Sequence, residues 1–161
     1  PDEITGVERD FVEQVVMGAG RPVLVLPFKD AADISLDDIV LGWDGGREAA
    51  RSAFDALPLL KMAKKVRVVR VDPQKDPSLR ASVPGADLAE TLARHGVKAE
   101  ARGFPTEGAD EGQALLRCAD DCGAGLIVMG AYGRSAWREL LFGGATRAVV
   151  NDLRLPVLMA H

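Results

Sequence analysis

The sequence has 161 residues, of which 47% are hydrophobic, and it carries a formal net charge of −4 at pH 7. This size suits one well-buried domain and is too short for two complete ones. Acidic and basic residues are interleaved without a basic stripe, which argues against a nucleic-acid-binding protein. No charged-then-apolar leader opens the sequence and no apolar run approaches about 20 residues, so we expect a cytoplasmic protein without a membrane span.

The first part of the sequence predicts a short helix followed by a short strand. Between residues 7 and 17 apolar residues recur with helical spacing, and Gly18 and Gly20 then end the run. Residues 21–27 form a β-branched and leucine run between two prolines, which favours a short strand. A polar, acid-rich linker then leads to Asp38.

From residue 39 onward, predicted strands alternate with predicted helices. The strands are expected at residues 39–44, 66–71, 97–104, 126–129 and 155–160, and the helices at residues 47–65, 85–95 and 109–122. Pro58 falls inside the first of these helices and predicts a kink or a new first turn there. The alternation implies right-handed βαβ units, and therefore an open, doubly wound α/β fold with a parallel sheet.

The polar residues with catalytic or metal-binding chemistry are few. Cys118 and Cys122 lie four positions apart in a helical pattern, and without nearby histidines they indicate small core residues rather than a zinc site. His95 and His161 lie at a predicted helix end and at the last position, where no catalytic triad can be built around them. No phosphate-binding motif of the GxxxxGK[ST] type is present.

A glycine pattern follows the most apolar predicted strand. The run that starts at Leu126 ends in Gly130, and Gly133, Gly143 and Gly144 follow before a helix-like segment. Glycines in a loop that leads into a helix let an anion approach backbone N–H groups at the positive end of the helix dipole. The pattern therefore indicates an anion-binding loop, although the same glycines could serve only to make turns.

The predicted sheet places an acid opposite this loop. In doubly wound sheets, ligands bind beyond the carboxyl ends of the strands, at the point where the strand order reverses. Asp44 and Gly130 each lie at the carboxyl end of a predicted strand. If those two strands are neighbours, the carboxylate and the glycine loop face each other across one crevice.

The two ends of the sequence resemble each other. Five residues recur 134 positions later, namely Val15, Val16, Pro22, Val23 and Leu24 as Val149, Val150, Pro156, Val157 and Leu158. A repeat of this period indicates a duplicated domain. We therefore expect residues 1–28 to be the tail of an upstream sister domain, or an extension that mimics the last unit, with residues 29–38 as a linker.

The predicted strand near Val23 needs a sheet edge to satisfy its backbone groups. The expected position is beside residues 157–160, in the same chain or in a partner's. This pairing would make the last strand the contact with a sister domain or with a second subunit in a homodimer.

Residues 39–161 resemble a universal stress protein domain along nearly their whole length. The most specific element of that family is G-x2-G-x9-G followed by Ser or Thr, which here reads Gly130, Gly133 and Gly143, with Gly144 where the hydroxyl is expected. Asp44, followed by two glycines, resembles the Asp-Gly-Ser turn after the first strand of the family. The resemblance implies a five-stranded parallel sheet in the order 3-2-1-4-5, to which the N-terminal segment adds an edge strand.

The resemblance also implies an adenine nucleotide, ATP, in the crevice between the first and fourth strands. Asp44 would accept a hydrogen bond from the ribose or adenine, Val71 would pack near the base, and Met129 with Gly130 would line the pocket. The residues that would hold the phosphates are Gly133, Arg134, Gly143, Gly144 and Ala145. Arg134 could instead be a solvated loop residue.

Two functions follow from the resemblance. The first is a stress-response regulator that binds ATP, with at most a slow ATPase activity. The second is a nucleotide-independent module for interaction or dimerisation, which Gly144 favours because the missing hydroxyl removes one hydrogen bond of about 1 kcal/mol.

Overall fold

The computed structural model describes residues 6–27, 35–71, 83, 85–108, 111–131 and 155–161. Its strands are β1 (Val23–Val25), β2 (Asp38–Gly42), β3 (Lys65–Val71), β4 (Ala99–Phe104), β5 (Leu126–Gly130) and β6 (Val157–Ala160). Its helices are α1 (Gly6–Gly18), α2 (Arg47–Asp55), α3 (Leu57–Leu60), α4 (Ala86–Arg94) and α5 (Glu111–Cys122). The phosphate-loop residues of the sequence prediction lie outside the described residues.

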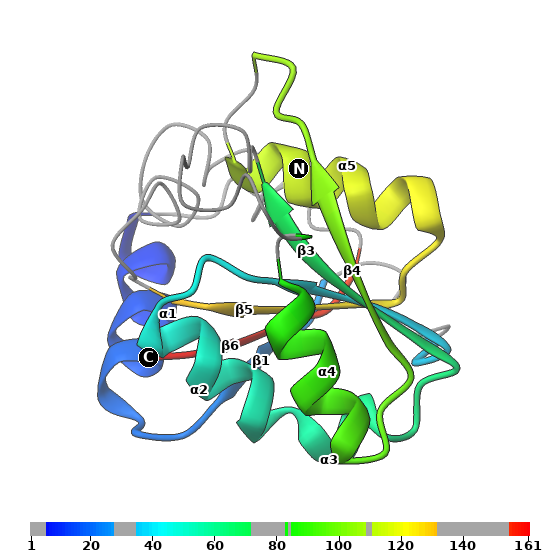
Figure 1. The fold of residues 1–161 in the computed structure, drawn as a ribbon. Coiled ribbons are helices and arrows are strands. Elements are labelled where there is room, and N and C mark those ends of the chain that lie inside the picture. The colour runs from blue at the N-terminus through cyan, green and yellow to red at the C-terminus, as the bar shows by residue number, and fades with distance from the viewer. Residues whose placement is uncertain (1–5, 28–34, 72–82, 84, 109–110, 132–154) are drawn as a thin grey trace.

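The six strands form one sheet in the order β1-β6-β5-β2-β3-β4 (Figure 1). The strands β2 to β6 all run parallel to one another. Numbered in chain order, these five parallel strands have the order 3-2-1-4-5, as expected. β1 pairs antiparallel with β6 in the same chain, which confirms the expected edge strand.

Helices cover both faces of the sheet, and each face has its own buried cluster (Figure 1). α5 and Val16 of α1 pack on one face, together with Val40, Ile127 and Met159 of the strands. α2, α3 and α4 pack on the other face, where the strands contribute residues such as Leu41. Because the central strands are buried on both sides, they appear in the sequence as continuous apolar runs instead of alternating ones.

The helix expected over residues 47–65 is in fact two helices. α2 ends at Asp55, and α3 starts a new first turn that contains Pro58. Proline is tolerated in a first turn because the N–H group that it lacks would have no helical partner there. α3 ends at Leu60, so the predicted end at residue 65 was wrong, and Lys65 instead begins β3.

Gly130, the last residue of β5, allows α2 to lie directly against the sheet. A Cβ atom on Gly130 would come within 2.5 Å of the Ala49 backbone nitrogen and 2.6 Å of the Glu48 carbonyl carbon. Both atoms belong to the backbone of the first turns of α2, so no side-chain rotation could relieve the clash. The absence of a side chain at this position therefore determines how closely α2 approaches β5.

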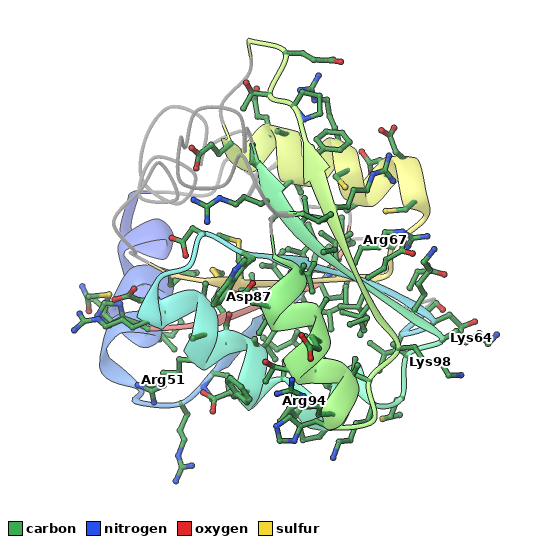
Figure 2. All side chains as sticks on the ribbon, in the orientation of Figure 1. Arg51, Lys64, Arg67, Asp87, Arg94 and Lys98 are labelled. Atoms are coloured by element: carbon green, nitrogen blue, oxygen red, sulfur yellow. The ribbon has the colours of Figure 1, made fainter. Side chains whose placement is uncertain are left out.

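Arg51 of α2 connects the N-terminal segment to the end of the chain. Its Nη1 donates a hydrogen bond to the His161 carbonyl oxygen and its Nη2 donates one to the Gly20 carbonyl oxygen, each at 2.7 Å. Figure 2 shows Arg51 on α2, away from the labelled residues of α4. One guanidinium group thus holds the loop before β1 beside the residue that follows β6.

Replacing Gly130 with alanine tests the close approach of α2. We expect Gly130→Ala to lower the free energy of unfolding by about 1–3 kcal/mol, because the backbone of α2 must shift. Urea denaturation measures the change. Gly18→Ala is the control, since a Cβ there would meet nothing within 4 Å. Equal stability of the two variants would contradict this explanation of Gly130.

Removing the guanidinium group of Arg51 should loosen the N-terminal segment. The Arg51 side chain is 45% exposed, so we expect its two hydrogen bonds to contribute about 1 kcal/mol together. In Arg51→Ala the amides of Val23–Val25 should therefore exchange with deuterium about fivefold faster. Arg94→Ala, which removes an exposed pair with Glu90 on α4, should leave those amides unchanged. Unchanged exchange in both variants would show that Arg51 does not hold this segment.

Candidate functional site

The strand order reverses between β2 and β5, and this reversal defines the candidate site. β2 pairs with β3 on one side and with β5 on the other. Leu41 of β2 pairs with Val128 of β5. Asp44 lies three residues after Leu41, and Gly130 lies two residues after Val128. The structure therefore brings Asp44 and Gly130 to the same end of neighbouring strands, as the sequence predicted.

Asp44 forms the turn that starts α2. Its Oδ1 accepts a hydrogen bond of 2.7 Å from the Gly46 backbone N–H, and Gly45 has a φ of +80°. A carboxylate that accepts a hydrogen bond from the second following residue stabilises such a turn, and glycine adopts positive φ without strain. The turn uses Oδ1 and leaves the carboxylate partly exposed beside the sheet edge.

Arg70 adds a positive charge to this turn and was not among the predicted site residues. It is the second-last residue of β3, the strand next to β2, and its Nη1 lies 3.5 Å from the position of a Cβ on Gly45. The register of the neighbouring strand places this guanidinium group against Gly45 of the turn. The only sequence indication is that arginines interrupt the apolar pattern of residues 65–71.

Val71 and Met129 are buried in the cluster on the α5 face of the sheet. Their exposed fractions are 9% and 2%, so Met129 contributes its side chain to the core. Trp43 is partly buried and packs against the cluster on the opposite face. The remaining predicted site residues, Gly133, Arg134, Gly143, Gly144 and Ala145, lie outside the described residues.

A cavity of about 320 Å³ opens beside the first turns of α2 and is lined by Arg47, Glu48, Arg51 and His161. Arg47 Nε lies 2.6 Å from Glu48 Oε1, and this hydrogen bond lowers the pKa of the Glu48 carboxyl below its usual range. The opposite charges of the two side chains compensate each other, so this cavity is not a simple anion site. In the sequence, Arg47, Glu48 and Arg51 look like ordinary solvated residues near the start of a helix.

Cys118 is a core residue and the half-buried Cys122 packs against the same cluster, in agreement with the sequence prediction. Cys118 is buried, and burial raises the pKa of its thiol to about 11. The Cys122 thiol donates a hydrogen bond to the Cys118 carbonyl oxygen. Within the described residues, no three His, Cys, Asp or Glu side chains are grouped so that they could hold a metal ion. No helix in that part of the chain is long and apolar enough to span a membrane.

Three solved structures illustrate the similarity of this fold to known proteins. A universal stress protein from Archaeoglobus fulgidus DSM 4304 has 17% identity and a TM-score of 0.64, over 86% of this chain and 49% of that chain. A universal stress protein in complex with cAMP has 19% identity and a TM-score of 0.52, over 78% and 97%. A protein from the universal stress protein family from Burkholderia pseudomallei has 26% identity and a TM-score of 0.53, over 77% and 95%.

The chain thus spans about half the length of the Archaeoglobus protein. Comparison with curated protein sequences found no match. The model of the universal stress protein family matches residues 35–161, which is most of the chain. This match, the parallel sheet with its reversal between β2 and β5, and the positions of Asp44 and Gly130 lead to one conclusion: the chain belongs to the universal stress protein family.

Proposed function

We propose that this chain is a stress-response regulatory protein that binds an adenine nucleotide, ATP, in the crevice between the carboxyl ends of β2 and β5. The observation that carries the proposal is the pairing of β2 with β5, which brings Asp44 to the same sheet edge as Gly130. The sequence after Gly130 supplies the glycines and the arginine expected of a phosphate loop.

The chemistry of the crevice suits the two ends of a nucleotide. Asp44 Oδ1 accepts the Gly46 N–H, and because each carboxylate oxygen can accept more than one hydrogen bond, the same group could also accept one from a ribose hydroxyl. Backbone N–H groups of Gly133, Gly143, Gly144 and Ala145, together with the Arg134 guanidinium group, would bind the phosphates. The similar universal stress protein that was solved with cAMP supports an adenine nucleotide as the ligand.

The alternative is a nucleotide-independent module whose role is interaction with another protein or domain. Gly144 favours this alternative because it lacks the hydroxyl expected at the end of the loop motif. The outer edge of β1, with which no strand pairs within the described residues, offers a place for such a partner. The two functions differ in whether nucleotide occupies the protein.

The first test is the nucleotide content of the purified protein and the role of Asp44. We expect mass spectrometry of the released small molecules to detect ATP, and calorimetry to detect its rebinding. Asp44→Asn keeps an oxygen for the Gly46 N–H but loses the charge, so the affinity should fall about tenfold. If no nucleotide is released and millimolar ATP does not bind, the alternative function holds. Equal affinity in Asp44→Asn would place the nucleotide elsewhere.

The second test restores the missing hydroxyl of the loop. Gly144→Ser should tighten ATP binding about fivefold, because one added hydrogen bond to a phosphate contributes about 1 kcal/mol. Gly18→Ser, at the end of α1, is the matched control and should leave the affinity unchanged. An unchanged affinity in Gly144→Ser, combined with a weaker one in Asp44→Asn, would show that the phosphates do not reach this part of the loop.

A further inference from the structure

β1 pairs with β6 in a two-fold symmetric register that follows the sequence repeat. The three facing pairs are Val23 with Met159, Leu24 with Leu158, and Val25 with Val157. Leu24 and Leu158 are counterparts in the repeat, so each faces its own equivalent. In the other two pairs the counterparts are exchanged: Val23 faces Met159, the counterpart of Val25, and Val25 faces Val157, the counterpart of Val23. This exchange is the signature of an isologous interface between two copies of one unit.

On the face of the sheet where α2 packs, the side chains of β6 are buried but Leu24 of β1 is exposed. Leu158 is 7% exposed and belongs to the cluster beneath α2, whereas its counterpart Leu24 is 47% exposed. Ala160 is 1% exposed, whereas its counterpart Leu26 is 49% exposed. Within the described residues no helix covers Leu24 and Leu26, and no strand pairs with the outer edge of β1.

We propose that residues 6–27 are the last helix and strand of a second α/β unit of this same fold, encoded ahead of them in the same polypeptide. The body of that unit would pair its own β5 equivalent with the outer edge of β1. Its α2 equivalent would cover Leu24 and Leu26. The sheet would then continue across a two-fold axis that passes between Leu24 and Leu158.

The order of the elements along the chain and the length of the Archaeoglobus protein support an upstream unit as the occupant of this face. The counterparts of Val23 and Leu24 are Val157 and Leu158 in β6, the last strand of the fold, so the rest of such a unit precedes its last strand in sequence. The Archaeoglobus structure matches 86% of this chain with only 49% of its own, which leaves room for a second unit of this size.

A second copy of this chain fits the exposed face less well. In each copy the β6 edge is already occupied by β1 of the same chain. A second copy could therefore offer only its own β1 edge, on which within the described residues no helix covers this face, or its β4 edge, which would make a head-to-tail contact and not a two-fold symmetric one. The symmetric register is explained by a tandem unit and not by association of identical chains.

The test is the accessibility of position 24 in the polypeptide that the native gene encodes and in the 161-residue chain alone. With Leu24→Cys, we expect the introduced thiol to react with a maleimide at least about tenfold more slowly in the gene's polypeptide, because the interface must open first. Met62→Cys, at a side chain that is 68% exposed, is the control and should react equally in both proteins. The two proteins without an introduced cysteine give the background reaction rate of Cys122, and Cys118 is buried.

Three results would overturn the proposal. The first is a gene whose product has no α/β unit ahead of residue 6. The second is an equal reaction rate of the Leu24→Cys thiol in both proteins. The third is protection of that thiol in the 161-residue chain that rises with concentration, together with a dimer in sedimentation velocity, because a second copy would then be the occupant. None of these readouts requires a nucleotide, so they are independent of the proposed ATP site.

Discussion

The contact between the first turns of α2 and Gly130 is the constraint on which the candidate site depends. A parallel sheet must be covered on both faces, and here α2 approaches β5 so closely that only glycine fits beneath its backbone. That approach fixes where α2 begins, and the Asp44 turn immediately precedes it. The acid at the end of β2 is therefore positioned by the same packing that covers the core.

The positions of the strands could be predicted because full burial leaves a clear record in the sequence. Residues 39–42 and 126–130 are continuous apolar runs, and each ends where a glycine or an acid starts a turn. The strand order itself came from the family resemblance, since periodicity does not distinguish one neighbour from another. With that order, the proximity of Asp44 and Gly130 followed from the position of each residue on its strand.

Other features depend on tertiary contacts that no local pattern records. Residues 61–65 suit a helix, but the backbone amides of Lys64 and Lys65 donate to the Asp37 carbonyl oxygen, and Arg67 pairs with Asp38. These contacts with the start of β2 draw the chain into β3. Arg70 and Glu48 also could not be identified, because their roles arise from a neighbouring strand and from burial. Gly130 was identified for its spacing, but its packing against α2 became apparent only in the structure.

α2 has a mechanical consequence for the molecule because it touches two separate regions within one turn. Its N-terminal end follows the Asp44 turn, and Arg51, four residues or about 6 Å after Arg47, holds the Gly20 carbonyl. A rigid helical turn transmits displacement without needing a chain of intermediate side chains. The turn at Asp44 and the segment that carries β1 are thus held by the same short helix, so a rigid-body shift of α2 would displace both.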